Sequence, residues 1–306
     1  MGGRSPDRHR RHPAPTGKST PETATLALFP DQPPVAHYGT GTGLAVALAP
    51  RPYLHPVRTI GGTPVTELMP ASHRHHLGAG LAVPDVGGAN FWGGRTFVPG
   101  HGPMWLDNHG TQRHREWLRR EPATLSHALH WAAIGGEVLL AERRTLACRP
   151  VSDDAWALDV DFTLTNLTGR PLAIRSPATQ GRVGAGYGGF FWRAPTGAHP
   201  ARAIGPGGAD LADLHGATAD WLALTGSTGD RDWTLIFAGA TERTRRDRWF
   251  VRIRDYIGVG SSLAWDRPLV LAPAEVTTRR IVTVIADGIL RPAQIRDLAT
   301  GLGSGP

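Results

Sequence analysis

Hydrophobic and polar residues alternate with a period of two along most of the chain from residue 23 onward. In the clearest segment, Trp156, Leu158, Val160, Phe162 and Leu164 share one face, and mostly Asp and Thr residues share the other. Because side chains of a strand point alternately to its two faces, this segment is predicted to be a half-buried β-strand. The same reasoning predicts strands at 43–49, 137–148, 171–175, 221–225, 233–238, 249–254 and 268–272.

Two segments near the end of the chain depart from simple alternation. Residues 281–286 are apolar at nearly every position, which predicts a central strand that is buried on both faces. Residues 291–302 give the only helix prediction, with Pro292 in the first turn and Gly301 at the end.

Short strands separated by turn signals, without alternation of strands and helices, indicate an all-β fold. The 39 glycines and 26 prolines fit many tight turns. Residues 1–22 are rich in Arg, His, Pro, Ser and Thr, with little to bury. We therefore predict a large antiparallel two-sheet sandwich at 23–306, as one domain, with a disordered basic tail at 1–22 and a short C-terminal helix.

Charge and cysteine content narrow the class of protein. The formal net charge is +7, and the five basic residues of the tail, set against Asp7 and Glu22, supply +3 of it. The remaining excess shows no clustering of the kind that nucleic-acid binding needs. A single cysteine, Cys148, excludes an internal disulfide and suits a reducing compartment. With no signal peptide and no long apolar run, we expect a soluble cytoplasmic protein.

The strongest candidate for chemistry is the segment His73-Arg74-His75-His76, which lies between Pro70 and Gly78. In an extended chain, His73 and His75 would point away from Arg74 and His76. Histidine exchanges protons and binds metals near neutral pH. Three interpretations remain open: a solvated loop, a proton-transfer or anion-binding site, and a metal site. The metal site would use two or three of His55, His73, His75 and His76.

A second candidate segment is 184–195, which begins with Gly-x-Gly-x-x-Gly. The glycines precede a predicted strand rather than a helix, so no nucleotide cofactor is expected. Tyr187 and Arg193 could contact a ligand, because aromatic faces pack on sugar rings and Arg holds carboxylates. Phe190 and Phe191 are predicted to be core residues.

Two further segments contain candidate groups. Residues 105–116, which include His114, offer acidic and basic side chains close together, or form an exposed loop. The basic run at 243–248 is predicted to be a solvated turn. No Gly-x-Ser-x-Gly motif occurs and Cys148 lies in a predicted strand, which disfavours covalent hydrolase chemistry.

The chain resembles a bacterial family that is often labelled "methane oxygenase PmoA". The shared segments follow one another from about residue 35 to about residue 290: Arg51-Pro52-Tyr53-Leu54-His55-Pro56, His73 to Gly78, Asn90-Phe91-Trp92, Gly186 to Pro195, Trp249-Phe250-Val251-Arg252, Leu263 to Leu269 and Leu271 to Glu275.

This resemblance implies a β supersandwich similar to the galactose mutarotase fold. Many such proteins bind or act on carbohydrates in a groove on the concave sheet. The association of the family with sugar catabolism points to oxidised or keto-sugar substrates. The basic tail and the 243–248 run lie outside the shared pattern and leave room for a specialised role, such as tailoring a sugar-bearing natural product.

The resulting hypothesis is a carbohydrate-directed enzyme that uses general acid–base chemistry, as an isomerase, a lyase or a hydrolase. One alternative is a carbohydrate-binding protein without catalysis, and another is a metal-dependent enzyme acting on a non-sugar metabolite. The predicted roles are acid or base for His75 or His76, with His55 assisting; a divalent metal on His55, His73 and His75; and ligand contacts from Arg74, Trp92, His114, Tyr187 and Arg193.

Overall fold

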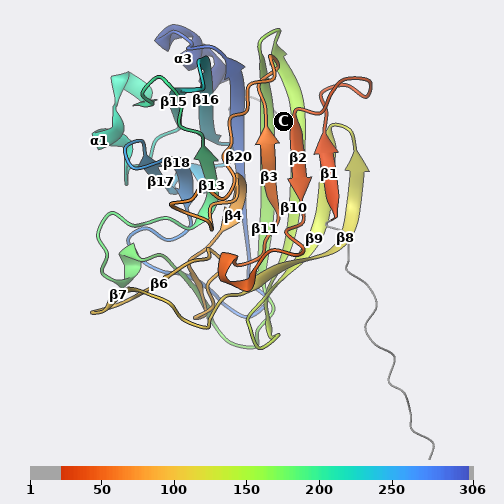
Figure 1. Cartoon of the computed structure of the whole chain (residues 1–306). Coiled ribbons are helices and arrows are strands. Elements are labelled where there is room, and N and C mark those ends of the chain that lie inside the picture. The colour runs from red at the N-terminus through yellow and green to blue at the C-terminus, as the bar shows by residue number, and fades with distance from the viewer. Residues whose placement is uncertain (1–21, 303–306) are drawn as a thin grey trace, which may run out of the picture.

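Two large antiparallel sheets form the body of the protein in a computed structural model that describes residues 22–302 (Figure 1). The seven-stranded sheet has the order β1 (Thr23–Leu26), β2 (Ala36–Gly39), β3 (Tyr53–Val57), β4 (Ala79–Ala82), β13 (Gly189–Ala194), β18 (Ile257–Ser262) and β17 (Arg248–Arg252). The eight-stranded sheet has the order β14 (Arg202–Ile204), β15 (Trp221–Thr228), β16 (Arg231–Gly239), β20 (Val276–Asp287), β11 (Ala155–Asn166), β10 (Val138–Ser152), β9 (Thr124–Ala132) and β8 (Thr111–Glu121). The all-β prediction is confirmed; the predicted tail, except Glu22, lies outside the described residues.

The two sheets face each other across one hydrophobic core. Trp192 of β13 and Phe237 of β16, one from each sheet, lie with ring centroids 5.6 Å apart. The predicted inward residues of β11 are all buried in this core, as the alternating pattern requires. Cys148 is buried in β10, where its thiol donates to the Ala27 carbonyl at 3.4 Å.

Strand β20 is central in the eight-stranded sheet and is covered on both faces. Ile281 and Ile285 face the second sheet, and Val282 and Val284 pack in a separate cluster with α3 (Pro292–Gly301). Figure 1 shows α3 at the end of this sheet, close to β15 and β16. The predictions of a doubly buried strand and a C-terminal helix are thus confirmed. No helix within residues 22–302 is long and apolar enough to cross a bilayer.

Some local predictions were wrong. Residues 43–49 contain a 3₁₀ helix, η1 (Val46–Leu48), because Gly43 (φ +89°) and Ala49 (φ +49°) leave the extended conformation at both ends. The strand predicted at 249–254 ends at Arg252. The one-turn helices α1 (Leu211–Leu214) and α2 (Glu242–Arg245) were not predicted, and α2 occupies part of the 243–248 run. The remaining elements are η2 (Ala178–Gln180), η3 (Pro206–Gly208), β5 (Asp85–Val86), β6 (Thr96–Val98), β7 (Gly102–Met104), β12 (Leu172–Arg175) and β19 (Leu269–Leu271).

The outer face of the seven-stranded sheet, turned away from the eight-stranded sheet, carries a second apolar cluster. On β13, Trp192 points into the main core, so its neighbour Phe191 points outward. Phe191 packs there with Trp92 and Phe250, against partly buried Tyr187 and Tyr256. We call these five residues the outer aromatic cluster. All of its members except Phe191 line the first cavity described below.

Candidate functional site

A cavity of about 670 Å³ opens beside the outer aromatic cluster. This volume lies within the range typical of small-molecule sites. Its chemically functional lining residues are His73, His75 and His76; Trp92, Phe97, Trp105, Tyr187, Phe250 and Tyr256; and Arg74, Arg95, Arg182, Arg252 and Asp255. The cavity therefore combines imidazoles, aromatic faces and guanidinium groups from segments that are far apart in the sequence.

The three histidines reach the cavity together because their segment is folded into turns. The His73 amide donates to the Pro70 carbonyl, and the His76 amide to the His73 carbonyl, each at 2.9 Å. Ring centroids are 4.7 Å apart for His73 and His76, and 4.8 Å apart for His75 and His76. The expectation that His73 and His75 would point away from His76 was therefore wrong, since it assumed an extended chain.

The position of His75 is fixed by groups on both sides. The buried guanidinium of Arg51 donates to the His75 carbonyl at 2.6 Å and to the Leu48 carbonyl at 2.7 Å. On the other side, Gly94 has φ +69°, and a Cβ there would lie 2.8 Å from His75 Nδ1. Only glycine allows this backbone to approach the imidazole so closely. His109 supports the same backbone by hydrogen bonding to the Gly94 carbonyl at 2.7 Å.

All three imidazoles are neutral at neutral pH. Burial, with a further contribution from Arg51, lowers the pKa of His75 to about 3. Burial and the neighbouring histidines lower the pKa of His76 still further, and burial together with Arg193 lowers that of His73. A neutral imidazole offers one N–H donor and one lone pair. The cavity can therefore both donate hydrogen bonds to a polar ligand and accept them from it.

Arg193 lies beneath this cavity rather than on its wall. Its Nε and Nη2 donate to one carboxylate oxygen of Glu67 at 2.8 and 2.7 Å, and its guanidinium carbon lies 4.8 Å from the Tyr256 ring centroid. Tyr256 also contacts His76, with centroids 5.1 Å apart. Within residues 22–302, Nη1 of Arg193 and Nδ1 of His76 are buried without a hydrogen-bond partner. Such atoms are uncommon in folded proteins. The described residues contain two others, Ser262 Oγ on β18 and Thr283 Oγ1 on β20.

Aromatic side chains supply the apolar part of the lining. Trp92 lies 4.6 Å from Tyr187 and 4.8 Å from Phe191, measured between ring centroids. Trp105, just after the β6–β7 hairpin, is 61% exposed and lines the same cavity. Burial raises the pKa of Tyr187, and it raises that of Tyr256 to about 12, so both phenols are protonated donors.

Two predicted site residues lie elsewhere. His55, on β3, does not line the cavity; its Nδ1 hydrogen-bonds to the Thr66 hydroxyl at 3.0 Å. The part of the chain that the structure describes contains no group of three His, Cys, Asp or Glu side chains able to hold a metal ion. The structure thus does not assemble His55, His73 and His75 into a metal site. His114, on β8, lines a different cavity of about 420 Å³.

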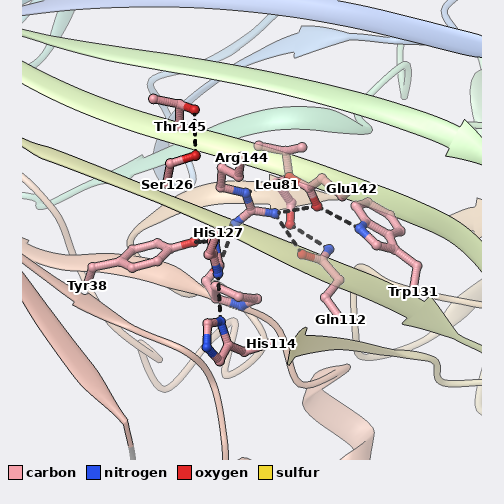
Figure 2. Close-up of polar contacts among 11 residues, drawn as sticks. Tyr38, Leu81, Gln112, His114, Ser126, His127, Trp131, Glu142, Arg144 and Thr145 are labelled. Atoms are coloured by element: carbon pink, nitrogen blue, oxygen red, sulfur yellow. Dashed lines mark hydrogen bonds and ion pairs between the residues drawn. The ribbon is translucent and has the colours of Figure 1, made fainter. Parts of the chain in front are cut away.

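His114 instead belongs to a buried polar network between the two sheets (Figure 2). Arg144 is at its centre and donates to both oxygens of Glu142, at 2.6 and 2.9 Å. The same guanidinium donates to Gln112 Oε1 at 3.0 Å and to the Tyr38 hydroxyl at 3.1 Å. Trp131 Nε1 donates a further hydrogen bond to Glu142 Oε2 at 2.7 Å. We call these residues, with His114 and His127, the Arg144 network.

The hydrogen-bond directions in this network follow from Arg144. Since Tyr38 accepts from Arg144, its own proton goes to His127 Nε2 at 2.8 Å. A neutral His127 then carries its proton on Nδ1 and donates to His114 Nδ1 at 2.9 Å. Burial, with Arg144 nearby, lowers the pKa of His127 to about 2 and keeps it neutral. Every side-chain donor and acceptor from Arg144 to His127 is thereby paired.

Sequence reasoning missed several residues that shape the cavity, among them Arg51, Arg95, Arg182, Arg252 and Tyr256. Arg51 and Arg252 lie in segments shared with the resembled family, but nothing in either segment indicates a role. Arg182 and Tyr256 lie in turns without any motif, so only the folded chain brings them to the site.

Comparisons with known proteins give a family and remote structural likenesses. The family model described as "family of unknown function (DUF6807)" matches residues 26–300. A comparison with curated proteins found no match. Among solved structures, a GalM/aldose epimerase homologue from C. elegans is 9% identical, with a TM-score of 0.40, and the match covers 88% of this chain and all of that one.

Two α-galactosidases are also similar in structure. The GH36 enzyme from Geobacillus stearothermophilus is 11% identical, with a TM-score of 0.40 and 87% of this chain covered. The enzyme from Lactobacillus brevis is 10% identical, with a TM-score of 0.35 and 62% of this chain covered. The matched regions span 41% and 28% of those two enzymes. Since the family model covers most of its length, this chain belongs to the DUF6807 family, whose function is unknown.

Proposed function

We propose that this protein is a carbohydrate-directed enzyme that works by general acid–base chemistry in the cavity lined by His73, His75 and His76. The observation that carries this proposal is the convergence of three neutral imidazoles on one cavity with aromatic walls. Aromatic faces bind the C–H faces of sugar rings, and convergent polar groups orient the hydroxyls.

In this proposal His75 or His76 transfers the proton, because both rings adjoin the cavity and each other. His73 stacks on His76 and orients it. Arg74 stabilises the oxyanion that develops on an enol or ring-opened sugar, as preorganised donors do. Arg193, beneath Tyr256, contributes its unpaired Nη1 as a further hydrogen-bond donor. Trp92 and Tyr187 hold the ring.

The experiment is a turnover assay by NMR on a panel of sugars, keto-sugars and keto-glycosides, with wild type, His75→Ala and His76→Ala. We expect each variant to lose about 10²- to 10⁴-fold in kcat, the usual contribution of a positioned acid or base. Arg113→Ala, an exposed change on β8, is the control and should keep full activity. Equal kcat in wild type and both histidine variants would contradict the proposal.

A non-catalytic carbohydrate-binding protein is the second candidate. It is favoured by the low pKa of His75, about 3, because burial makes that imidazole a weak base in the free protein. Binding of panel sugars by wild type, with no turnover of any of them, would support this second candidate over the first.

A further inference from the structure

The charged residues around the cavity are strongly unbalanced. Four arginines line it, and each comes from a different segment: Arg74 before β4, Arg95 after Trp92, Arg182 before β13 and Arg252 at the end of β17. Among the residues that the structure describes, the one acidic side chain that lines it is Asp255. Within residues 22–302, none of the four arginines forms an ion pair with an acidic side chain.

Some arginines outside the cavity are neutralised by ion pairs, whereas the four that line it are not paired within the described part of the chain. Arg248, four residues before Arg252, binds Asp266 at 2.8 Å, and Arg280 binds Asp159 at 2.6 Å. A concave surface lined by charges of one sign focuses its potential on the enclosed space. The neutral histidines do nothing to reduce this positive potential.

Two of the four guanidinium groups, those of Arg182 and Arg252, lie beside the aromatic part of the cavity. Burial raises the pKa of the Tyr256 phenol, and the positive charges of Arg252, Arg193 and Arg182 oppose this rise. Arg252 also lies over the Phe250 ring, with its guanidinium carbon 5.5 Å from the centroid. Arg193 and His76, whose Nη1 and Nδ1 are unpaired within residues 22–302, both contact the Tyr256 ring. Positive charge, unpaired polar atoms and aromatic faces therefore lie close together.

We propose that the ligand of this cavity is an acidic sugar whose carboxylate is bound by Arg182 and Arg252. This inference rests on the proposed function and specifies its substrate class. The planar fork of a guanidinium fits the two oxygens of a carboxylate, and its fixed positive charge attracts the anion. A neutral sugar would use the aromatic walls but would leave the arginines without an anionic partner. The sugar ring packs between Trp92 and Trp105, which line the cavity from neighbouring loops.

The test is isothermal titration calorimetry of the full chain with D-glucuronate and D-galacturonate, each compared with its neutral amide. We expect at least one uronate to bind about tenfold or more tightly than its amide, which is the size of one charge-assisted hydrogen bond. Raising the ionic strength should weaken uronate binding and leave amide binding unchanged.

A matched pair of variants locates the carboxylate. Arg252→Gln should weaken uronate binding about tenfold and leave amide binding unchanged. Arg254→Gln is the control, because Arg254 is exposed in the turn that follows β17 but does not line the cavity. Equal urea midpoints would show that both variants are folded.

The outcomes separate this inference from the proposed function. If amides and neutral sugars bind as tightly as uronates, the acidic-sugar inference fails and the proposed function stands. Tighter binding of D-glucose 6-phosphate than of both uronates would also overturn the carboxylate assignment. If none of the uronates, amides or neutral sugars binds, the proposed function itself fails.

Discussion

Two regions of this protein bury histidine side chains but differ in how their polar atoms are satisfied. In the Arg144 network, each donor and acceptor from Arg144 through Tyr38 to His127 is paired with another (Figure 2). At the cavity, His76 Nδ1 and Arg193 Nη1 have no partner within residues 22–302. Both sets are almost fully buried, so burial does not distinguish them.

This difference distinguishes a region that stabilises the fold from a region that binds a ligand. A fully paired buried network stabilises one packing of the two sheets, and its members are strongly interdependent. Buried groups without partners cost stability, and real proteins tolerate such costs mainly where function requires them. We therefore assign the Arg144 network to the fold and the His73–His76 cavity to the ligand.

The largest expected effect comes from breaking the ion pair of the network. Arg144→Met should lower the free energy of unfolding by about 3–5 kcal/mol, because it leaves the Glu142 carboxylate buried without its countercharge. Urea denaturation measures this change. The double variant Arg144→Met with Glu142→Met should recover much of the loss. A loss below about 1 kcal/mol in the single variant would show that the network is not the scaffold that we infer.

A matched pair of histidine substitutions sharpens the comparison. His127→Phe should lower the unfolding free energy by about 1–3 kcal/mol, because Tyr38 and His114 each lose a hydrogen-bond partner. His76→Phe removes an unpaired buried nitrogen, so stability should stay constant or rise by about 1 kcal/mol. Both are measured by urea denaturation. Equal destabilisation by the two changes would erase the distinction between the regions.

Lowering the pH is expected to lower the free energy of unfolding by a smaller amount per pH unit. The unfolded chain binds protons on histidine near pH 6.5, whereas the folded pKa values are about 3 for His75 and about 2 for His127. As pH falls below 6.5, the unfolded state gains protons that the folded state does not, so stability falls. Each group contributes at most about 1.4 kcal/mol per pH unit. Urea midpoints from pH 7 to 4 should therefore decline, and His127→Phe should flatten the decline.

The sequence predicted the sheets well because they depend on local periodicity. The alternation in 156–164 and the two-faced run at 281–286 correspond to strands β11 and β20. Pro292 and Gly301 indicated helix α3. The error at 43–49 arose because alternation says nothing about backbone conformation, and Gly43 and Ala49 turn the chain there.

The site was only partly predictable. His73, His75 and His76 were found because they are adjacent in sequence, but their shared direction depends on turns that begin at Pro70. His55 and His114 were grouped with them on residue type alone, and their strands place them elsewhere. Arg182 precedes β13, whereas Arg252 and Tyr256 lie at the two ends of the β17–β18 turn, and the pairing of β13 with β18 brings these two segments together.

The most direct test records how the Arg144 network and the His73–His76 cavity respond to a sugar in the same NMR spectrum. The measurement is the ¹⁵N chemical shifts of the histidine side chains, with assignments from single variants, during titration with the tightest-binding sugar of the calorimetry panel. Our account predicts that the imidazole signals of His73, His75 and His76 shift in a saturable manner while those of His114 and His127 stay fixed. Saturable shifts at His114 and His127, with the three cavity histidines unchanged, would contradict it.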